Sequence, residues 1–107
     1  NGENLSIDQI VDQVKSYGIN LVEITGGEPL LQKEVFSLME SLLINKFQVM
    51  LETSGSLSIK NVPKKVIKIL DLKCPGSGEE NKNLWENLNH LASTDEIKFV
   101  ISPTLTD

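Results

Sequence analysis

The sequence predicts an α/β fold in which helices cover a parallel sheet, and three observations support this. Short apolar strands alternate with amphipathic helices along most of the 107 residues. Polar, glycine-bearing segments follow three of the predicted strands, as ligand-binding loops do in parallel sheets. The predicted strand ends at Thr25, Glu52, Asp71 and Ile101 are 27, 19 and 30 residues apart. Two of these spacings match the roughly 30 residues of one (β/α) barrel unit, and the middle one implies a shortened connection. We therefore expect a single domain, residues 1–107, that is a parallel-sheet segment of a partial (β/α) barrel with about four strands.

The first half of the chain is predicted to run helix, strand, helix. The first helix begins after Ser6, because Ser6 and Gln9 have the spacing of a capping box. Gly18 provides a left-handed helix end, and a strand follows at Asn20–Thr25. The second helix runs from about Gln32 to Ile44. Apolar residues recur at helical spacing on one face of each helix: Ile7, Ile10, Val11 and Val14, then Val35, Leu38, Met39, Leu42 and Leu43.

The second half is predicted to contain three more strands, at Phe47–Glu52, Val66–Leu72 and Glu96–Ile101. A short helix is expected at Asn83–Leu91, between the last two strands. The connections at the amino ends of these strands look like plain solvated loops. Only the opposite ends of the strands carry residues with distinctive chemistry.

Composition narrows the classes of function. With 39% hydrophobic and 23% charged residues, the chain resembles an ordinary soluble protein. The net charge is −5 and every cation is a lysine, which does not favour nucleic acid as a partner. The single cysteine, Cys74, forms no internal disulfide and fits a reducing cytoplasm. No apolar run approaches the ~18 residues that span a bilayer, and the N-terminus lacks the features of a signal peptide. We expect a cytoplasmic protein that binds a small molecule and no membrane.

Three polar segments follow the predicted strands: "TGGEP" at Thr25–Pro29, "ETSGS" at Glu52–Ser56 and "DLKCPGSGEE" at Asp71–Glu80. Because the carboxyl ends of parallel strands share one edge of a sheet, the three segments should lie on one rim. Two adjacent glycines exceed what a strand-to-helix turn requires. They suggest that the backbone itself must lie close to a ligand.

Each segment also has a structural interpretation. Gly26–Pro29 could be a tight turn with proline at the first helical position. Thr53 and Ser54 could satisfy local backbone groups, and Lys73 could form a surface ion pair with Asp71. Three further residues have structural interpretations: Cys74 as an inert thiol, His90 as a residue of the short helix, and Trp85 as a packing residue beside it.

The combination of "GGEP" after a strand with "ETSG" and "DLKCPGSG" resembles the radical S-adenosylmethionine (SAM) superfamily and, within it, the 7-carboxy-7-deazaguanine synthase family. The resemblance covers Val22 to about Ile101. It implies that a 4Fe-4S cluster cleaves SAM to a 5′-deoxyadenosyl radical. This radical would convert 6-carboxy-5,6,7,8-tetrahydropterin to 7-carboxy-7-deazaguanine in queuosine biosynthesis, with Mg2+ steering the rearrangement. The resemblance also implies a flavodoxin or ferredoxin as reductant, and a homodimer.

The same resemblance implies a ligand site. Backbone groups at the two glycines, with the glutamate that follows, would accept hydrogen bonds from the methionine ammonium of SAM, and Thr25 would face the substrate. A lysine suits a carboxylate as a point charge, and hydroxyl groups suit ribose. The residues implied to bind SAM are Gly26, Gly27, Glu28, Glu52, Ser54, Lys73 and Ser77.

The chain departs from the family in one respect. The cysteine triplet of CxxxCxxC type that holds the cluster is expected upstream of Ser6, together with the Mg2+ ligand, and Cys74 alone cannot replace three or four thiolates. We therefore expect an interior fragment that is inactive by itself and that self-associates. Two alternatives remain: another radical SAM enzyme, such as a glycyl-radical-enzyme activase that shares "GGEP", or a binding module without redox chemistry.

Overall fold

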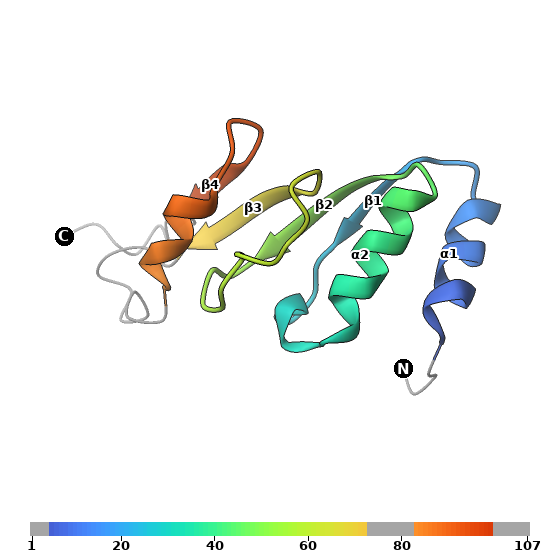
Figure 1. Cartoon of the computed structure of the whole chain (residues 1–107), viewed down its shortest axis with the longest axis horizontal. Helices are drawn as coiled ribbons and strands as arrows, with labels where there is room; N and C mark the ends of the chain where they lie inside the picture. Colours follow the sequence, from blue (N-terminus) through green and yellow to red (C-terminus); the bar gives the residue numbers. More distant parts are fainter. Residues whose placement is uncertain (1–4, 73–82, 100–107) are drawn as a thin grey trace, which may run out of the picture.

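The computed structural model describes residues 5–72 and 83–99, which form a four-stranded parallel sheet with helices packed on one face (Figure 1). The α/β fold with about four strands is confirmed. Two of the helical elements, η1 and η3, are 3-10 helices. The order along the chain is α1 (Ile7–Ser16), β1 (Leu21–Ile24), η1 (Pro29–Leu31), α2 (Glu34–Ile44), β2 (Gln48–Thr53), β3 (Ile67–Leu72), η3 (Trp85–His90) and β4 (Glu96–Phe99).

The first helix, α1, has the predicted ends. The Ser6 hydroxyl accepts from the Gln9 amide at 3.1 Å, and the Gln9 side chain accepts from the Ser6 amide at 2.8 Å. This reciprocal pair is a complete capping box. Gly18 follows with φ +73°, so the left-handed residue that ends the helix is also confirmed.

The second helix, α2, begins at Glu34 rather than at Gln32. Gln32 has an extended backbone, because the chain first closes the 3-10 turn η1 behind Pro29. The end of α2 is a Schellman turn, in which Lys46 takes the left-handed conformation and the Phe47 amide donates to the Leu42 carbonyl at 3.0 Å. Since the Phe47 amide is used there, β2 begins one residue later than predicted.

The four strands pair in chain order, and every pair is parallel. Along β2 the side chains alternate between the two faces of the sheet, so that Val49, Leu51 and Thr53 are buried while Met50 and Glu52 are only partly covered. The predicted strand at Glu96–Ile101 appears as β4, and its last two positions lie outside the described residues. The predicted helix at 83–91 is the 3-10 helix η3, in which Trp85 and His90 are exposed.

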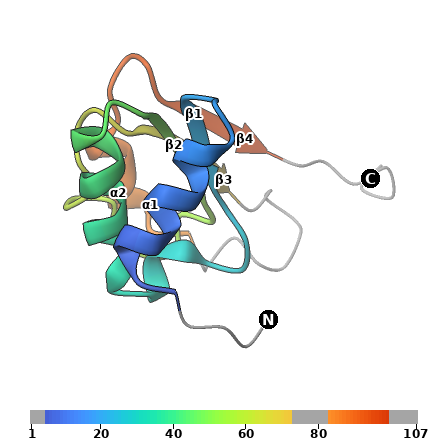
Figure 2. The same cartoon turned by 90° about the vertical axis from the view of Figure 1, so that its right-hand side faces the viewer.

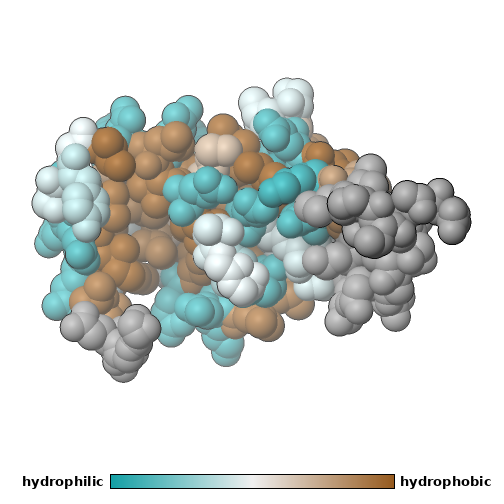
Figure 3. All heavy atoms as spheres, turned by 180° about the vertical axis from the view of Figure 1, so that it is seen from behind, coloured by the Kyte–Doolittle hydropathy of each residue, from teal (hydrophilic) through white to brown (hydrophobic). Residues whose placement is uncertain are grey.

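The core lies between the sheet and the elements that cover it. Figure 2 shows α2 on one side of the strands and α1 at the β1 end of the sheet. Figure 3 shows the molecule from the opposite side, where apolar and polar surfaces lie next to each other. Among residues 5–72 and 83–99, thirteen buried apolar residues form the core: Val11, Leu30, Val35, Met39, Leu42, Phe47, Val49, Leu51, Ile59, Val62, Val66, Leu70 and Leu72.

A buried ion pair fixes the start of β4 to β3. The Lys68 ammonium lies 3.3 Å from the Asp95 carboxylate, and both side chains are almost fully buried. The two Asp95 oxygens also accept from the backbone amides of Lys68 and Ala92, each at 2.8 Å. A buried charge that keeps its partner and its hydrogen bonds is tolerated, whereas loss of one partner costs several kcal/mol, roughly 3–5.

The sheet ends at β1 on one side and at β4 on the other within the described residues, and both strands expose apolar side chains. Leu21, Ile97 and Phe99 are 47%, 45% and 47% exposed. Unpaired strand edges are templates for another chain.

The described helices, in residues 5–72 and 83–99, include none with the length and apolar character of a membrane span.

We predict that the 107-residue chain self-associates, because the described part of the chain leaves two edge strands and their apolar side chains uncovered. Light scattering at micromolar concentration should give a mass above the 11.9 kDa of one chain. Ile97→Lys should shift the population toward monomer. Leu31→Lys is the control, since Leu31 is 72% exposed but lies on η1, away from both edges. A wild-type chain that is purely monomeric would contradict this prediction.

Candidate functional site

Two of the three predicted polar segments lie together at the carboxyl-end rim of the sheet. Because β1 and β2 are parallel and Ile24 pairs with Leu51, the residues after each strand emerge at the same edge (Figure 1). The side chain of Glu28 bridges the first segment to the second. Of the third segment, Asp71 and Leu72 end β3, whereas Lys73 and Ser77 lie outside the described residues.

The Glu28 carboxylate is surrounded by hydrogen-bond donors from the protein. One oxygen accepts from the Ser54 amide at 2.9 Å and the Ser54 hydroxyl at 2.8 Å. The other accepts from the Leu30 amide at 2.9 Å, and the Thr53 hydroxyl lies within 2.9 Å of both oxygens. We call Glu28, Leu30, Thr53 and Ser54 the Glu28 network. It caps η1 and joins the turn after β1 to the end of β2.

Electrostatics within the Glu28 network favour the ionised acid. Burial by itself would raise the pKa of Glu28. The amides of Ser54 and Leu30, with the hydroxyls of Thr53 and Ser54, stabilise the charged form more strongly, so the pKa lies below the ordinary value of 4.5. Glu28 is therefore an ionised acceptor at neutral pH.

The two glycines before Glu28 differ in what the fold requires of them. Gly26 has φ +118°, a conformation that side-chain-bearing residues rarely adopt. Gly27 has no such backbone constraint, and a Cβ atom built on it meets nothing within 4 Å. Within the described residues, the fold thus explains the first glycine but gives no reason for the second.

The backbone of the glycine turn is exposed. Both Gly26 and Gly27 are exposed residues, and within residues 5–72 and 83–99 their carbonyl oxygens accept no hydrogen bond. Two open acceptors beside an uncrowded glycine form a surface that a donor group can approach closely.

The segment after β2 is held from a second side by Asn87 of η3. Asn87 is fully buried, and its amide nitrogen donates to the carbonyls of Gly55 and Leu57 at 3.2 and 2.8 Å. Its side-chain oxygen accepts from the Ile59 amide at 2.9 Å. Gly55 itself has φ +78°, and a Cβ atom there would lie 2.7 Å from Leu72. The Glu28 network and Asn87 together fix the course of residues 53–59.

Glu52 lies on the other face of the sheet from this network. Strand alternation directs it to the face without helices, where its carboxylate pairs with the Lys98 ammonium at 3.2 Å. The hydrogen bond to Glu52 and the charge of Glu52, followed by those of Asp71 and Glu23, raise the pKa of Lys98. These side chains form a charged group on the open face of the sheet.

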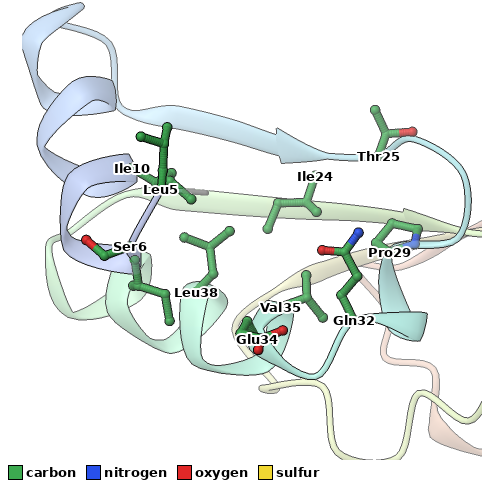
Figure 4. Close-up of a pocket in the computed structure, with 11 residues that line it drawn as sticks. Leu5, Ser6, Ile10, Ile24, Thr25, Pro29, Gln32, Glu34, Val35 and Leu38 are labelled. Carbon is green, nitrogen blue, oxygen red and sulfur yellow. The ribbon is translucent and has the colours of Figure 1, made fainter. Parts of the chain in front are cut away.

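An apolar groove of about 760 Å³ lies between α1, β1 and α2. Figure 4 shows that Ile24 of β1 and Val35 and Leu38 of α2 face this space, while Leu5 and Ile10 line it beside α1. Thr25 stands at the end of β1 and is directed away from Ile24. The groove therefore lies on the helix side, and Thr25 stands between it and the open face.

The structure brings together Gly26, Gly27, Glu28 and Ser54 of the predicted SAM-binding residues, with Thr25 adjacent, and it separates Glu52 from them. Sequence reasoning missed Asn87 and Lys98, and it gave Thr53 only a local structural role. Strand alternation could have placed Lys98 on the face of Glu52, since polar and apolar residues alternate in Glu96–Phe99. No local pattern marks Asn87.

Comparison with known proteins gives closely similar sequences. A 7-carboxy-7-deazaguanine synthase from Koribacter versatilis is 50% identical over 103 residues, which cover 94% of this chain and 46% of that protein. The chain is homologous to a segment of the 7-carboxy-7-deazaguanine synthases. The predicted resemblance to this family is confirmed.

Two further synthases support this relationship. The one from Chlorobaculum tepidum is 40% identical over 98 residues, 92% of this chain and 44% of that protein. The one from Methanospirillum hungatei is 39% identical over 102 residues, 94% of this chain and 42% of that protein. The chain thus spans less than half the length of these synthases. No family model and no solved structure matches the chain.

We predict that the Glu28 network makes stability depend on pH. Because folding lowers the pKa of Glu28, the stabilisation that its ionised carboxylate gives the fold is complete above pH 4.5. This stabilisation is lost as the pH falls through the lowered pKa. Glu28→Gln should cost about 1–3 kcal/mol of unfolding free energy at pH 7, and less at pH 3. Urea unfolding at both pH values measures the difference.

Glu40→Gln is the matched control, because Glu40 is exposed on α2 and takes no part in this network. It should change stability little at either pH. An equal cost of Glu28→Gln at pH 7 and pH 3 would show that the ionised carboxylate does not stabilise the fold.

Proposed function

We propose that this chain is part of a radical SAM enzyme, a 7-carboxy-7-deazaguanine synthase, and that its carboxyl-end rim forms one wall of the SAM site. In the whole enzyme the substrate would be 6-carboxy-5,6,7,8-tetrahydropterin. The proposal rests first on the 50% identity to a protein of that name over 94% of the chain. This identity also favours the synthase over a glycyl-radical-enzyme activase or a binding module.

The observation that carries the ligand assignment is Gly27. Within residues 5–72 and 83–99 the fold does not require a glycine there, and the carbonyls of Gly26 and Gly27 accept no hydrogen bond. Such a surface suits the methionine ammonium of SAM, which carries only hydrogen-bond donors. Bound SAM would supply an adenosyl group for hydrogen abstraction from the pterin.

We further propose roles for the remaining predicted residues. Thr25 would face the pterin, and Ser54 would shape the wall behind the glycine turn. Lys73 and Ser77 would hold the carboxylate and ribose of SAM, with Glu52 nearer the open face. Of these, Lys73 and Ser77 rest on the resemblance alone.

The 4Fe-4S cluster does not fit the residues of this chain, because one cysteine cannot provide three or four thiolates. Within residues 5–72 and 83–99, no three side chains of the His, Cys, Asp or Glu type lie together in a metal-binding group. We place the ligands of the cluster and of Mg2+ in the part of the synthases to which this chain does not align. A flavodoxin or ferredoxin and a second subunit would be partners of the whole enzyme.

We predict that a full-length protein containing this chain converts the carboxy-tetrahydropterin to 7-carboxy-7-deazaguanine under anaerobic conditions with SAM and a reductant. Gly27→Ala should raise the Kd for SAM by about tenfold or more, because the added methyl group would keep the ligand away from the glycine carbonyls. A tenfold change in Kd corresponds to a loss of ~1.4 kcal/mol of binding free energy. The unfolding free energy of Gly27→Ala should stay equal or rise by about 0.4–1 kcal/mol. Equilibrium dialysis and urea unfolding measure the two effects.

Gly26→Ala is the comparison variant, since its positive φ predicts a loss of stability of about 1–3 kcal/mol. A wild-type protein that forms no 7-carboxy-7-deazaguanine would refute the proposed function. Normal SAM affinity in Gly27→Ala would refute the role given to the glycine turn.

We predict that the 107-residue chain alone binds no iron-sulfur cluster and does not cleave SAM. Anaerobic reconstitution followed by iron and sulfide analysis is the measurement, with the full-length protein as positive control. About four irons per chain would contradict this prediction.

A further inference from the structure

The proton positions in the Glu28 network follow from the charge of Glu28. An ionised carboxylate only accepts hydrogen bonds and offers about four lone-pair directions. The amides of Leu30 and Ser54 and the hydroxyls of Thr53 and Ser54 are four donors at 2.8–2.9 Å. The acceptor capacity of this side chain is therefore used within the protein.

The direction of the next hydrogen bond also follows. Ser54 has one hydroxyl proton, which it donates to Glu28, so the 2.9 Å contact between the Ser54 and Ser56 hydroxyls must be donated by Ser56. The Ser54 hydroxyl additionally accepts from the Ser56 amide at 3.3 Å. Neither Glu28 nor Ser54 then retains a free donor or a free carboxylate oxygen for a ligand.

We propose that Glu28 is a positioning residue, whose carboxylate holds the Gly26–Gly27 turn against the end of β2 while the glycine carbonyls contact the ligand ammonium. This inference rests on the proposed function. In a direct role, the Glu28 carboxylate would itself contact the ammonium. In the positioning role, the carboxylate acts through the turn that it holds.

The geometry supports an indirect role. Glu28 follows the glycine turn directly, and its partners Thr53 and Ser54 are fixed by β2 and, through residues 55–59, by Asn87. The carbonyls of Gly26 and Gly27 accept no hydrogen bond within the part of the chain that the structure describes. The rim therefore presents backbone acceptors, while the oxygens of the ionised Glu28 carboxylate are already occupied by protein donors.

Thr53→Val distinguishes the two roles. Thr53 is 1% exposed and cannot touch a ligand, and valine keeps its shape while removing the hydroxyl that donates to Glu28. In the full-length protein, a positioning role predicts a Kd for SAM about tenfold higher, the equivalent of one lost hydrogen bond to a charged group. Thr53→Ser, which keeps the hydroxyl, should stay within about threefold of wild type.

Val66→Ala controls for lost stability. Val66 is as buried as Thr53, but it precedes β3 and so lies at the amino ends of the strands, away from the Glu28 network. The Kd of Val66→Ala for SAM should equal that of wild type.

Affinity in Thr53→Val that is unchanged or tighter would overturn the inference, because a freed carboxylate should then bind the ammonium at least as well. If Thr53→Val does not fold, Thr53→Ala, which also removes the hydroxyl, is judged by the same criterion. Wild-type protein that binds no SAM would instead overturn the proposed function, and this inference with it.

Discussion

The rim of this molecule depends on one carboxylate, that of Glu28, which joins residues 25 positions apart in the chain. The contact exists only because β1 and β2 are parallel and in register, so that both strands end at the same edge. Loss of the four donors that surround Glu28 would be costly in folding free energy, because the ionised carboxylate would then lack hydrogen-bond partners. The network therefore links the course of the glycine turn to the position of β2, and any change in strand register would break it.

Strand alternation divides the functions of the sheet between its two faces. On the helix side, alternate residues of β2 and β3 are buried, and β2 lies against α2. On the open face, the same alternation gathers Glu23, Glu52, Asp71 and Lys98. Thr53 and Glu52 are neighbours in sequence, yet one supports the rim from within the core and the other belongs to the charged group on the open face. A single strand thus serves both packing and surface chemistry.

Much of the fold was predictable because its signals are local. The capping box at Ser6, the left-handed Gly18 and the helical spacing of α2 depend on residues within one or two turns of each other. The partners of Glu28 and the buried Asn87 depend on residues far apart in sequence, and no local pattern encodes them. The same reason explains Lys68, whose burial in β3 is possible only beside Asp95.

The described fold accounts for the other glycines near the rim but not for Gly27. Gly26 and Gly55 have positive φ, so the backbone itself accounts for them. Gly27 has no left-handed φ, and a Cβ atom built on it meets no atom within 4 Å, so the described residues do not explain this glycine. What distinguishes the position is its place between open carbonyls and the saturated carboxylate of Glu28. A ligand that approaches there meets acceptors first, so the surface selects a group rich in donors, such as an ammonium, over an anion.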